Sequence, residues 1–301
     1  MSRYSGAGHI RRLIEISKAL PASIEKYFYG SIEIEWVRDM AHRSFLPLNS
    51  LSELGPEDFV LVDSYEESFC LEVNSEFSDS RIIQIADRYT FLLPDTKIVY
   101  VDLPFSYRDS KIKSRVIAHG IEYLPMRSFP RKRNTFTERA KKVLVTTGGS
   151  VNEQIFSQLV EELSRSKYGN VYFEFIGNYE SSKLHQSNLK FRNFGSGFDS
   201  VMGNCDTAIS TAGTTMWDLF ANRKIVGLTA MVENQIANFD YAIKNGQALE
   251  VFDPKKLKLD VGALQSLLFD SNVRKSLYDE TFGKYDFGGA KRVVEVILKN
   301  L

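Results

Sequence analysis

The most informative chemistry-bearing residues of the chain lie between Ser210 and Asp218. This segment follows an apolar run and places Gly213 beside Thr214 and Thr215. Glycine lets the backbone approach a ligand closely, and backbone N–H groups at a helix N-terminus bind anions. The pattern therefore predicts a phosphate-binding turn, with Asp218 one helical turn later and near a neighbouring ribose. Each hydroxyl could equally cap the helix, and an acid also suits a first helical turn.

Two further loops have the same composition. Gly149 and Ser150 lie between an expected strand at 142–146 and a helix from Asn152 onward, which suggests a diphosphate loop or an ordinary glycine-rich turn. Asn234 and Gln235 in another loop could bind sugar hydroxyls or cap a helix. The chain lacks a Walker A motif, and no Gly-x-Gly-x-x-Gly follows a strand. ATP hydrolysis by a phosphate loop and dinucleotide binding are therefore disfavoured.

A candidate base lies near the beginning of the chain. Gly8 and His9 lead into a helical segment expected at 10–20. Histidine titrates near neutral pH, so His9 could accept a proton from water or could simply be a polar residue near the chain end. Arg12, one turn later, could meet a phosphate or face solvent.

Acidic residues follow two of the expected strands. Asp63 and Tyr65 come after the apolar run at 60–63, and Asp87 follows the run at 81–85. Strand carboxyl ends carry the ligand sites of open α/β sheets. Asp63 could therefore orient His9 or bind substrate, and its alternative role is to cap the helix that begins near Glu66. Asp87 has the same two interpretations.

Alternation of apolar runs with helix-like segments indicates the fold class. Such alternation predicts parallel sheets covered by helices on both faces. The polar, basic stretch at 128–139 predicts a linker, which divides the chain into domains at 1–130 and 138–301. The expected strands are 60–63, 81–85, 97–103, 142–146, 170–176, 207–210 and 224–228, and the clearest expected helices are 66–76, 152–166, 231–245 and 290–301.

Bulk composition excludes several functional classes. The 301 residues favour two domains, and Lys plus Arg equals Asp plus Glu at 38 each, which argues against a nucleic-acid-binding surface. Cys70 and Cys205 lack metal-ligand spacing and a partner pattern, so we expect a reduced, cytoplasmic protein with no metal site and no cofactor. No apolar run is long enough for a membrane span of roughly 18 residues.

The order and spacing of these motifs resemble a known family. The chain is similar to the nucleotide-sugar hydrolases of the pseudaminic acid pathway and to their relatives in spore-coat polysaccharide synthesis, which have the GT-B fold. The residues that carry the resemblance are Gly6-Ala7-Gly8-His9-Ile10-Arg11-Arg12, Asp63-Ser64-Tyr65, Gly120 to Arg127, Val143 to Thr146 with Gly148-Gly149-Ser150, Ser210 to Asp218, and Asn234-Gln235.

The resemblance implies two Rossmann-like domains with a cleft between them, of which the first is catalytic and the second holds UDP. His9 would activate water, and Tyr65 would line the sugar site. The backbone of Gly149 and of Gly213–Thr215 would hold the diphosphate. Asp218 would bind the ribose, and Asn234 would reach the sugar or the diphosphate.

The implied reaction is hydrolysis of a UDP-linked amino or deoxy sugar. The alternatives are a GT-B glycosyltransferase, in which an acceptor hydroxyl replaces water, and a non-catalytic nucleotide-sugar binding protein.

Several features depart from the family pattern, and two of them bear most on the site and the fold. Asp218 stands where the family usually has Glu, which is longer by one methylene. The apolar strand that should precede the Gly-x-Gly-His loop is nearly missing, because only Met1–Tyr4 come before Ser5. We expect either a start upstream or a stub formed by these four residues. A doubly wound domain without this central strand would be left open.

Overall fold

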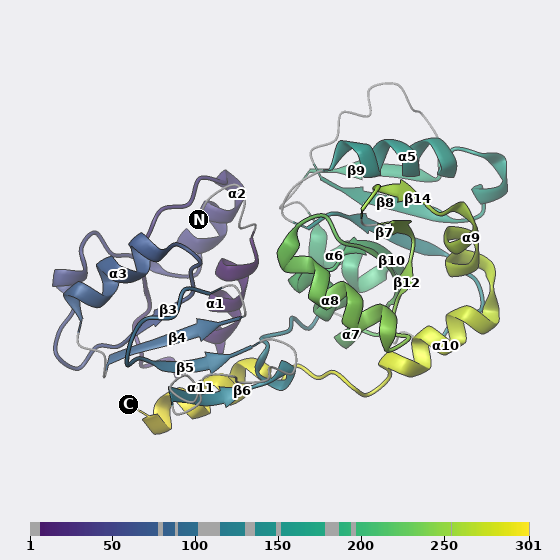
Figure 1. The fold of residues 1–301 in the computed structure, drawn as a ribbon. Coiled ribbons are helices and arrows are strands. Elements are labelled where there is room, and N and C mark those ends of the chain that lie inside the picture. Colours follow the sequence, from purple (N-terminus) through teal and green to yellow (C-terminus); the bar gives the residue numbers. More distant parts are fainter. Residues whose placement is uncertain are drawn as a thin grey trace. The chain divides into compact units, whose positions relative to one another are not determined.

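The computed structural model describes most of the chain and divides it into two compact units. Unit 1 comprises Met1–Met126 together with Asp286–Leu301, and unit 2 comprises Arg127–Tyr285. The residues described are 7–77, 81–87, 90–101, 115–129, 136–148, 152–177, 187–193, 197–253 and 255–300. Met1–Tyr4, Gly149 and Ser150 therefore lie outside the described residues. Figure 1 shows the elements of both units.

Unit 1 is built on parallel strands, as the alternating pattern predicts. Four strands form one sheet in the order β3-β4-β5-β6, and a separate parallel pair is formed by β1 and β2. The strands are β1 (Tyr27–Phe28), β2 (Leu46–Pro47), β3 (Val60–Val62), β4 (Ile82–Ala86), β5 (Lys97–Tyr100) and β6 (Val116–His119). The helices are α1 (Gly8–Ala19), α2 (Glu35–His42), α3 (Glu67–Glu76) and α11 (Gly289–Asn300), with 3-10 turns η1 (Leu51–Glu53) and η3 (Ile121–Tyr123).

The C-terminal helix belongs to unit 1, and this corrects the expected domain at 138–301. Helix α11 contacts α1, η3 and β6 of unit 1. Its apolar stripe explains the placement, because Val293, Val294 and Ile297 recur at helical spacing and are buried. The sequence shows that such a stripe needs a partner, but it does not say which unit provides one.

Unit 2 is a six-stranded parallel sheet in the order β12-β11-β10-β7-β8-β9. Its strands are β7 (Lys142–Thr146), β8 (Tyr172–Ile176), β9 (Leu189–Arg192), β10 (Thr207–Thr211), β11 (Ile225–Thr229) and β12 (Leu249–Glu250), and β13 (Phe252–Asp253) pairs with β14 (Lys258–Leu259). Its helices are α5 (Glu153–Leu163), α6 (Phe198–Asn204), α7 (Thr214–Ala221), α8 (Glu233–Lys244), α9 (Val261–Phe269) and α10 (Ser271–Thr281), with the 3-10 turn η4 (Ser166–Tyr168).

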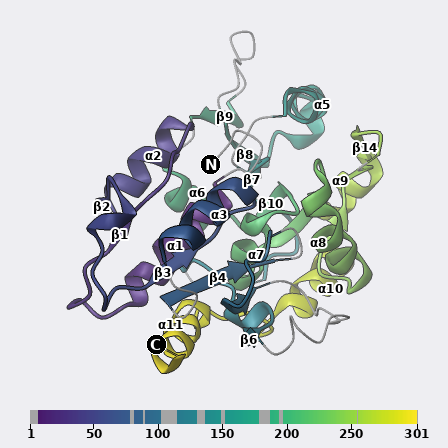
Figure 2. The ribbon, with the colours of Figure 1, turned by 60° about the vertical axis from the view of Figure 1, so that its left-hand side comes forward.

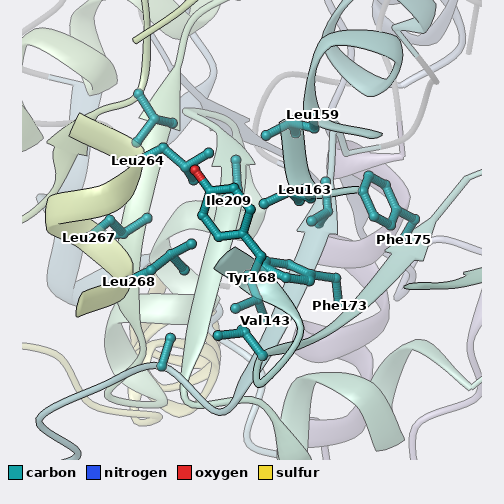
Figure 3. Close-up of a cluster of buried hydrophobic side chains, with 14 of the residues drawn as sticks. Val143, Leu159, Leu163, Tyr168, Phe173, Phe175, Ile209, Leu264, Leu267 and Leu268 are labelled. Carbon is teal, nitrogen blue, oxygen red and sulfur yellow. The ribbon is translucent and has the colours of Figure 1, made fainter. Parts of the chain in front are cut away.

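A continuous apolar core holds unit 2 together. Figure 3 shows side chains of α5 and α9 meeting those of the central strands, with Ile209 and Tyr168 between them. Tyr168 donates a hydrogen bond from its hydroxyl to Glu162 at 2.8 Å, so its polar end is satisfied although the residue is fully buried. This packing fixes the strands and thereby fixes the loops at their carboxyl ends.

Strand order locates the most favourable ligand position in unit 2. From β7 the chain proceeds to β8 and β9 on one side, and then crosses to β10, β11 and β12 on the other. The loops after β7 and β10 therefore leave the sheet in opposite directions. Open α/β sheets bind ligands in the crevice at such a switch point.

Candidate functional site

The structure brings His9 and Asp63 together in unit 1. Helix α1 begins at Gly8, which places His9 in its first turn, and Asp63 directly follows β3. The Nδ1 atom of His9 lies 2.5 Å from Oδ1 of Asp63, and His9 is only 5% exposed. With Nδ1 engaged by a carboxylate, Nε2 is the ring nitrogen that could exchange a proton with a substrate.

Arg12 does not face solvent, because its guanidinium is bound within unit 1. Its Nε and Nη2 atoms donate to the two oxygens of Asp63 at 3.0 and 2.6 Å. Nη1 donates to Asp87 at 3.3 Å, and the residue is buried. Arg12 lies three residues after His9, which is the spacing that puts two side chains on one helical face. The guanidinium therefore fixes Asp63 in the position from which it holds His9.

Tyr65 packs against the same imidazole. The two rings are 4.3 Å apart between centroids and meet edge to face at 85°. The Tyr65 hydroxyl donates to Oδ2 of Asp87 at 2.7 Å. Burial and the nearby Asp87 raise the pKa of Tyr65 far above its usual range, so the phenol stays protonated. Asp87 therefore receives hydrogen bonds from both Tyr65 and Arg12.

Opposite charges in this group stabilise one another within unit 1. Burial acts to raise the pKa of Asp63, but Arg12 and His9 outweigh it and hold that pKa below the usual range. Burial acts to lower the pKa of Arg12, but Asp63 and Asp87 outweigh it, so the guanidinium stays charged. A buried carboxylate that remains ionised can stabilise a proton gained by the neighbouring imidazole.

In unit 2 the loops after β7 and β10 are tied to each other at the switch point. Gly148 has a φ of 83°, a left-handed conformation that glycine adopts without strain. Its N–H donates to Oγ1 of Thr146 at 3.3 Å, and Oγ1 of Thr211 donates to the carbonyl of Thr147 at 3.3 Å. The turn at Gly148 is therefore held in one conformation beside the β10 loop.

The N-terminus of α7 has the geometry of an anion site. Gly213 precedes the helix and makes no side-chain cap, and Thr214 and Thr215 are its first two residues. A Cβ on Gly213 would first meet the Gln235 amide nitrogen at 3.8 Å, so the backbone is open to a close approach. Thr215 is only 6% exposed. Backbone amides presented in a largely buried turn suit a phosphate group.

The amides at the start of α8 have separate environments. Oε1 of Gln235 accepts from the Met231 N–H at 2.9 Å, and Nε2 donates to Oγ1 of Thr211 at 3.5 Å. Gln235 thus joins the β11 and β10 loops and has a structural task. Asn234 is half-buried in the first turn of α8.

Among the described residues, Thr229 at the end of β11 has a buried hydroxyl oxygen without a hydrogen-bond partner.

Asp218 has a partner that the sequence analysis did not assign. Its Oδ1 accepts from the Arg127 N–H at 2.8 Å, and its Oδ2 accepts from Nε at 2.8 Å and lies 2.7 Å from Nη2. The guanidinium also lies over the rings of Phe129 and Phe198. Both carboxylate oxygens are thus engaged within unit 2, and a ribose would have to share them.

Sequence reasoning missed the anchoring roles of Arg12, Arg127 and Gln235. Spacing from His9 was an available signal for Arg12. Arg127 and Asp218 lie far apart in the sequence, so only the folded chain reveals their pairing.

Comparisons with known proteins identify the fold. No protein-family model and no curated protein matches the chain. Among solved structures, the glycotransferase of kitacinnamycin aligns over 99% of this chain and 97% of its own, with a TM-score of 0.61 and 13% identity. MurG of Acinetobacter baumannii aligns over 98% and 97%, with a TM-score of 0.61 and 10% identity. CalG4, the calicheamicin glycosyltransferase, aligns over 99% and 96%, with a TM-score of 0.59 and 12% identity.

The chain has the GT-B fold. The expected class of two Rossmann-like domains is therefore confirmed. The hydrolase prediction is wrong, because the kitacinnamycin and calicheamicin neighbours are glycosyltransferases, and the glycosyltransferase alternative fits them better. Over the part of the chain that the structure describes, no helix has the length and apolar character needed to cross a membrane.

Proposed function

We propose that this GT-B protein is a glycosyltransferase that moves a sugar from a nucleotide-sugar donor, with UDP as the expected nucleotide, to an acceptor hydroxyl. The observation that carries the proposal is the His9–Asp63 pair, a buried base held by a carboxylate at 2.5 Å. Unit 2 supplies the complementary feature, an open helix N-terminus at a topological switch point.

In the proposed reaction, unit 2 holds the nucleotide diphosphate. The N–H groups at Gly213, Thr214 and Thr215 would face the diphosphate, and Gly148 would let the β7 loop approach it. As the bond from the anomeric carbon to the diphosphate breaks, negative charge grows on the leaving oxygen. Fixed backbone amides stabilise that charge where it develops. Asn234 is proposed to bind the sugar or the diphosphate.

Unit 1 would supply the base. Nε2 of His9 takes the proton of the acceptor hydroxyl while the acceptor oxygen forms the new bond to the anomeric carbon. The nucleotide diphosphate leaves with the electron pair of the broken bond. Asp63 stabilises the imidazolium that results, and Arg12 keeps Asp63 ionised. Tyr65 is proposed to line the sugar site beside the imidazole.

The names of the structural neighbours support the donor class. Besides the transferases, UDP-GlcNAc 2-epimerase from Neisseria meningitidis, solved with UDP-GlcNAc bound, aligns over 97% of this chain with a TM-score of 0.50 and 11% identity. We therefore place a nucleotide sugar, rather than a free sugar or a mononucleotide, as the donor.

The test is a donor and acceptor panel. The protein is incubated with UDP-, GDP- and CMP-sugars, with and without sugar and aromatic-alcohol acceptors, and nucleotide release is followed together with product mass. We expect nucleotide release that requires an acceptor and a product heavier by one glycosyl unit. Turnover should fall by about 10²–10⁴ in His9→Ala and persist in His42→Ala, which changes an exposed histidine at the end of α2. Equal nucleotide release with and without an acceptor would contradict transfer, and binding without any turnover would favour the non-catalytic alternative.

A further inference from the structure

Neighbouring strands bring a second acid to the His9 group. Figure 2 shows β3 and β4 lying side by side, and they pair in parallel, so their carboxyl ends meet at one edge of the sheet. Asp63 and Tyr65 follow β3 at this edge, and Asp87 follows β4. In the proposed reaction Asp63 and Tyr65 have tasks, and Asp87 has none.

Asp87 closes a circuit of contacts around the imidazole. In order, the members are His9, Asp63, Arg12, Asp87 and Tyr65, and the Tyr65 ring contacts His9 again. Oδ2 of Asp87 is a meeting point of this circuit, because it accepts from Tyr65 at 2.7 Å and from Arg12 at 3.3 Å. His9 is therefore held from two directions, through Asp63 and through Tyr65.

The hydrogen bond to Asp63 does not by itself fix the plane of the imidazole. It holds the Nδ1 atom of His9, and the ring could still turn about that bond. The Tyr65 ring lies 4.3 Å from the imidazole at 85°, an edge-to-face contact that suits only one orientation of the imidazole plane. The direction in which Nε2 of His9 points therefore depends on where the Tyr65 ring lies.

The position of the Tyr65 ring depends in turn on Asp87. Tyr65 lies in the segment between β3 and α3, outside both elements, so neither a strand ladder nor a helix holds it. A phenol has one O–H group, and that of Tyr65 donates to Asp87. The hydroxyl therefore serves as a tether for the ring, at the end that lies farthest from its own backbone.

Asp87 is itself fixed by Thr90. The Thr90 hydroxyl accepts from the Asp87 N–H at 2.9 Å and donates to Oδ1 of Asp87 at 3.4 Å, and the Thr90 N–H donates to the Asp87 carbonyl at 3.0 Å. Asp87 also follows directly on β4, in which every residue is buried. One carboxylate oxygen thus faces Thr90 and the other faces Tyr65 and Arg12, which defines the plane of the carboxylate.

We propose that Asp87 is a positioning residue that acts through the Tyr65 ring and keeps Nε2 of His9 directed at the acceptor hydroxyl. This role rests on the proposed function, because it serves the same proton transfer. Asp87 does not touch the reacting atoms in this role. It supports the two side chains, Tyr65 and Arg12, from which the base takes its orientation.

An effect of the Asp87 charge alone is the competing explanation, and substitutions separate the two. Asp87→Asn removes the charge but keeps an oxygen that can accept from the Tyr65 hydroxyl. Asp87→Ala removes both. Tyr65→Phe keeps the charge of Asp87 and the aromatic ring, and it removes only the hydrogen bond between them.

The experiment measures sugar transfer by the full chain with its best UDP-sugar donor and its best sugar or aromatic-alcohol acceptor. The proteins are the wild type, Asp87→Ala, Asp87→Asn, Tyr65→Phe and the double variant Asp87→Ala/Tyr65→Phe. Asp39→Asn, which changes an exposed acid on α2, is the matched control. For each protein, kcat and the KM of the acceptor are determined, UDP affinity is measured by calorimetry, and the folded fraction is checked by urea unfolding.

We expect Asp87→Ala to lower kcat by about 10–100-fold, because a small misplacement of a reacting group is costly in rate. UDP affinity should stay as in the wild type, and the KM of the acceptor should change less than kcat. Asp87→Asn should lose less than Asp87→Ala. The double variant should be no slower than Asp87→Ala, because both changes break the same hydrogen bond. Asp39→Asn should transfer like the wild type.

Three results overturn the proposal while leaving the proposed function intact. They are a wild-type kcat in Asp87→Ala, equal losses in Asp87→Ala and Asp87→Asn, and losses that multiply in the double variant. If Asp87→Ala does not fold, Tyr65→Phe tests the same bond without changing a charge, and a wild-type kcat there also overturns the proposal. Absence of transfer by the wild type itself contradicts the proposed function and removes this role with it.

Discussion

In unit 1, His9, Arg12, Asp63 and Asp87 form a buried network in which charged side chains bind one another. In unit 2, the loops around Gly148 and Gly213 present backbone amides and hydroxyls, and their contacts join one loop to the next. The first arrangement holds one proton-accepting group in place. The second leaves a surface that is open to an anion.

This difference bears directly on the proposed reaction. A base must keep its orientation, and His9 gains it from an ionised carboxylate whose own partners are fixed. A diphosphate brings its own negative charge to the site. Backbone amides at a helix N-terminus can bind that charge without added Lys or Arg side chains. The two sites should therefore respond to mutation in different ways.

The largest effect should come from Asp63→Asn. Removing the carboxylate charge leaves Arg12 buried without its main partner, and breaking a buried pair costs about 3–5 kcal/mol. We expect that loss in the free energy of unfolding of unit 1, measured in urea with Trp36 as the reporter in a Trp217→Phe background. Asp39→Asn, which changes an exposed acid on α2, should leave stability within about 0.5 kcal/mol. A small loss in Asp63→Asn would show that Arg12 has other partners.

Asp218→Asn should destabilise unit 2 by about 1.5–3 kcal/mol, the usual worth of hydrogen bonds to a charged group. Its carboxylate binds the Arg127 backbone and guanidinium, so stability should fall more than UDP affinity. Urea unfolding followed by Trp217 fluorescence and calorimetry with UDP measure the two quantities. A tenfold loss of UDP affinity with unchanged stability would instead favour the ribose contact implied by the family resemblance.

Gly148→Ala should weaken nucleotide binding by about tenfold, or 1.4 kcal/mol. The φ of 83° strains any residue with a Cβ, and the added methyl group would lie 3.7 Å from Oγ1 of Thr211. Gly283→Ala provides the matched control, since Gly283 has a φ of 73° and open space around it. Calorimetry with UDP should show the loss only for Gly148→Ala. Equal losses in both variants would trace the effect to general strain in unit 2.

The smallest effect concerns acid stability. The pKa of Asp63 is lower in the folded protein than in the unfolded chain, so its contribution to stability is present above its unfolded pKa of about 4. That contribution is lost as the pH falls through the lower, folded pKa. We expect the stability difference between the wild type and Asp63→Asn to shrink below about pH 4. Urea midpoints measured between pH 3 and 7 test this, and a constant difference would contradict it.

The sequence predicted the parts of this molecule that depend on local pattern. Apolar runs and helical segments recur as expected, for example in β7, β10, α5 and α8, because burial on both faces of a parallel sheet leaves a clear signature. The contact of His9 with Asp63 was foreseen as one option, because carboxyl ends of strands and the first turns of helices meet at one edge of the sheet.

The remaining features depend on tertiary pairing. Helix α11 carries an apolar stripe that either unit could have covered. Arginine side chains usually lie on the surface, so the sequence gives no reason to bury Arg12 or Arg127. Only the folded chain brings Arg12 to Asp63 and Arg127 to Asp218. The reaction class was mistaken, because water and an acceptor hydroxyl place the same demands on a base such as His9.

The most direct test of the division between the units is to measure donor binding and sugar transfer in one preparation of His9→Ala. The account predicts a UDP affinity within about twofold of the wild type and a transfer rate lower by about 10²–10⁴, the usual contribution of a positioned base. Transfer at the wild-type rate, or loss of UDP binding in parallel with loss of transfer, would contradict it.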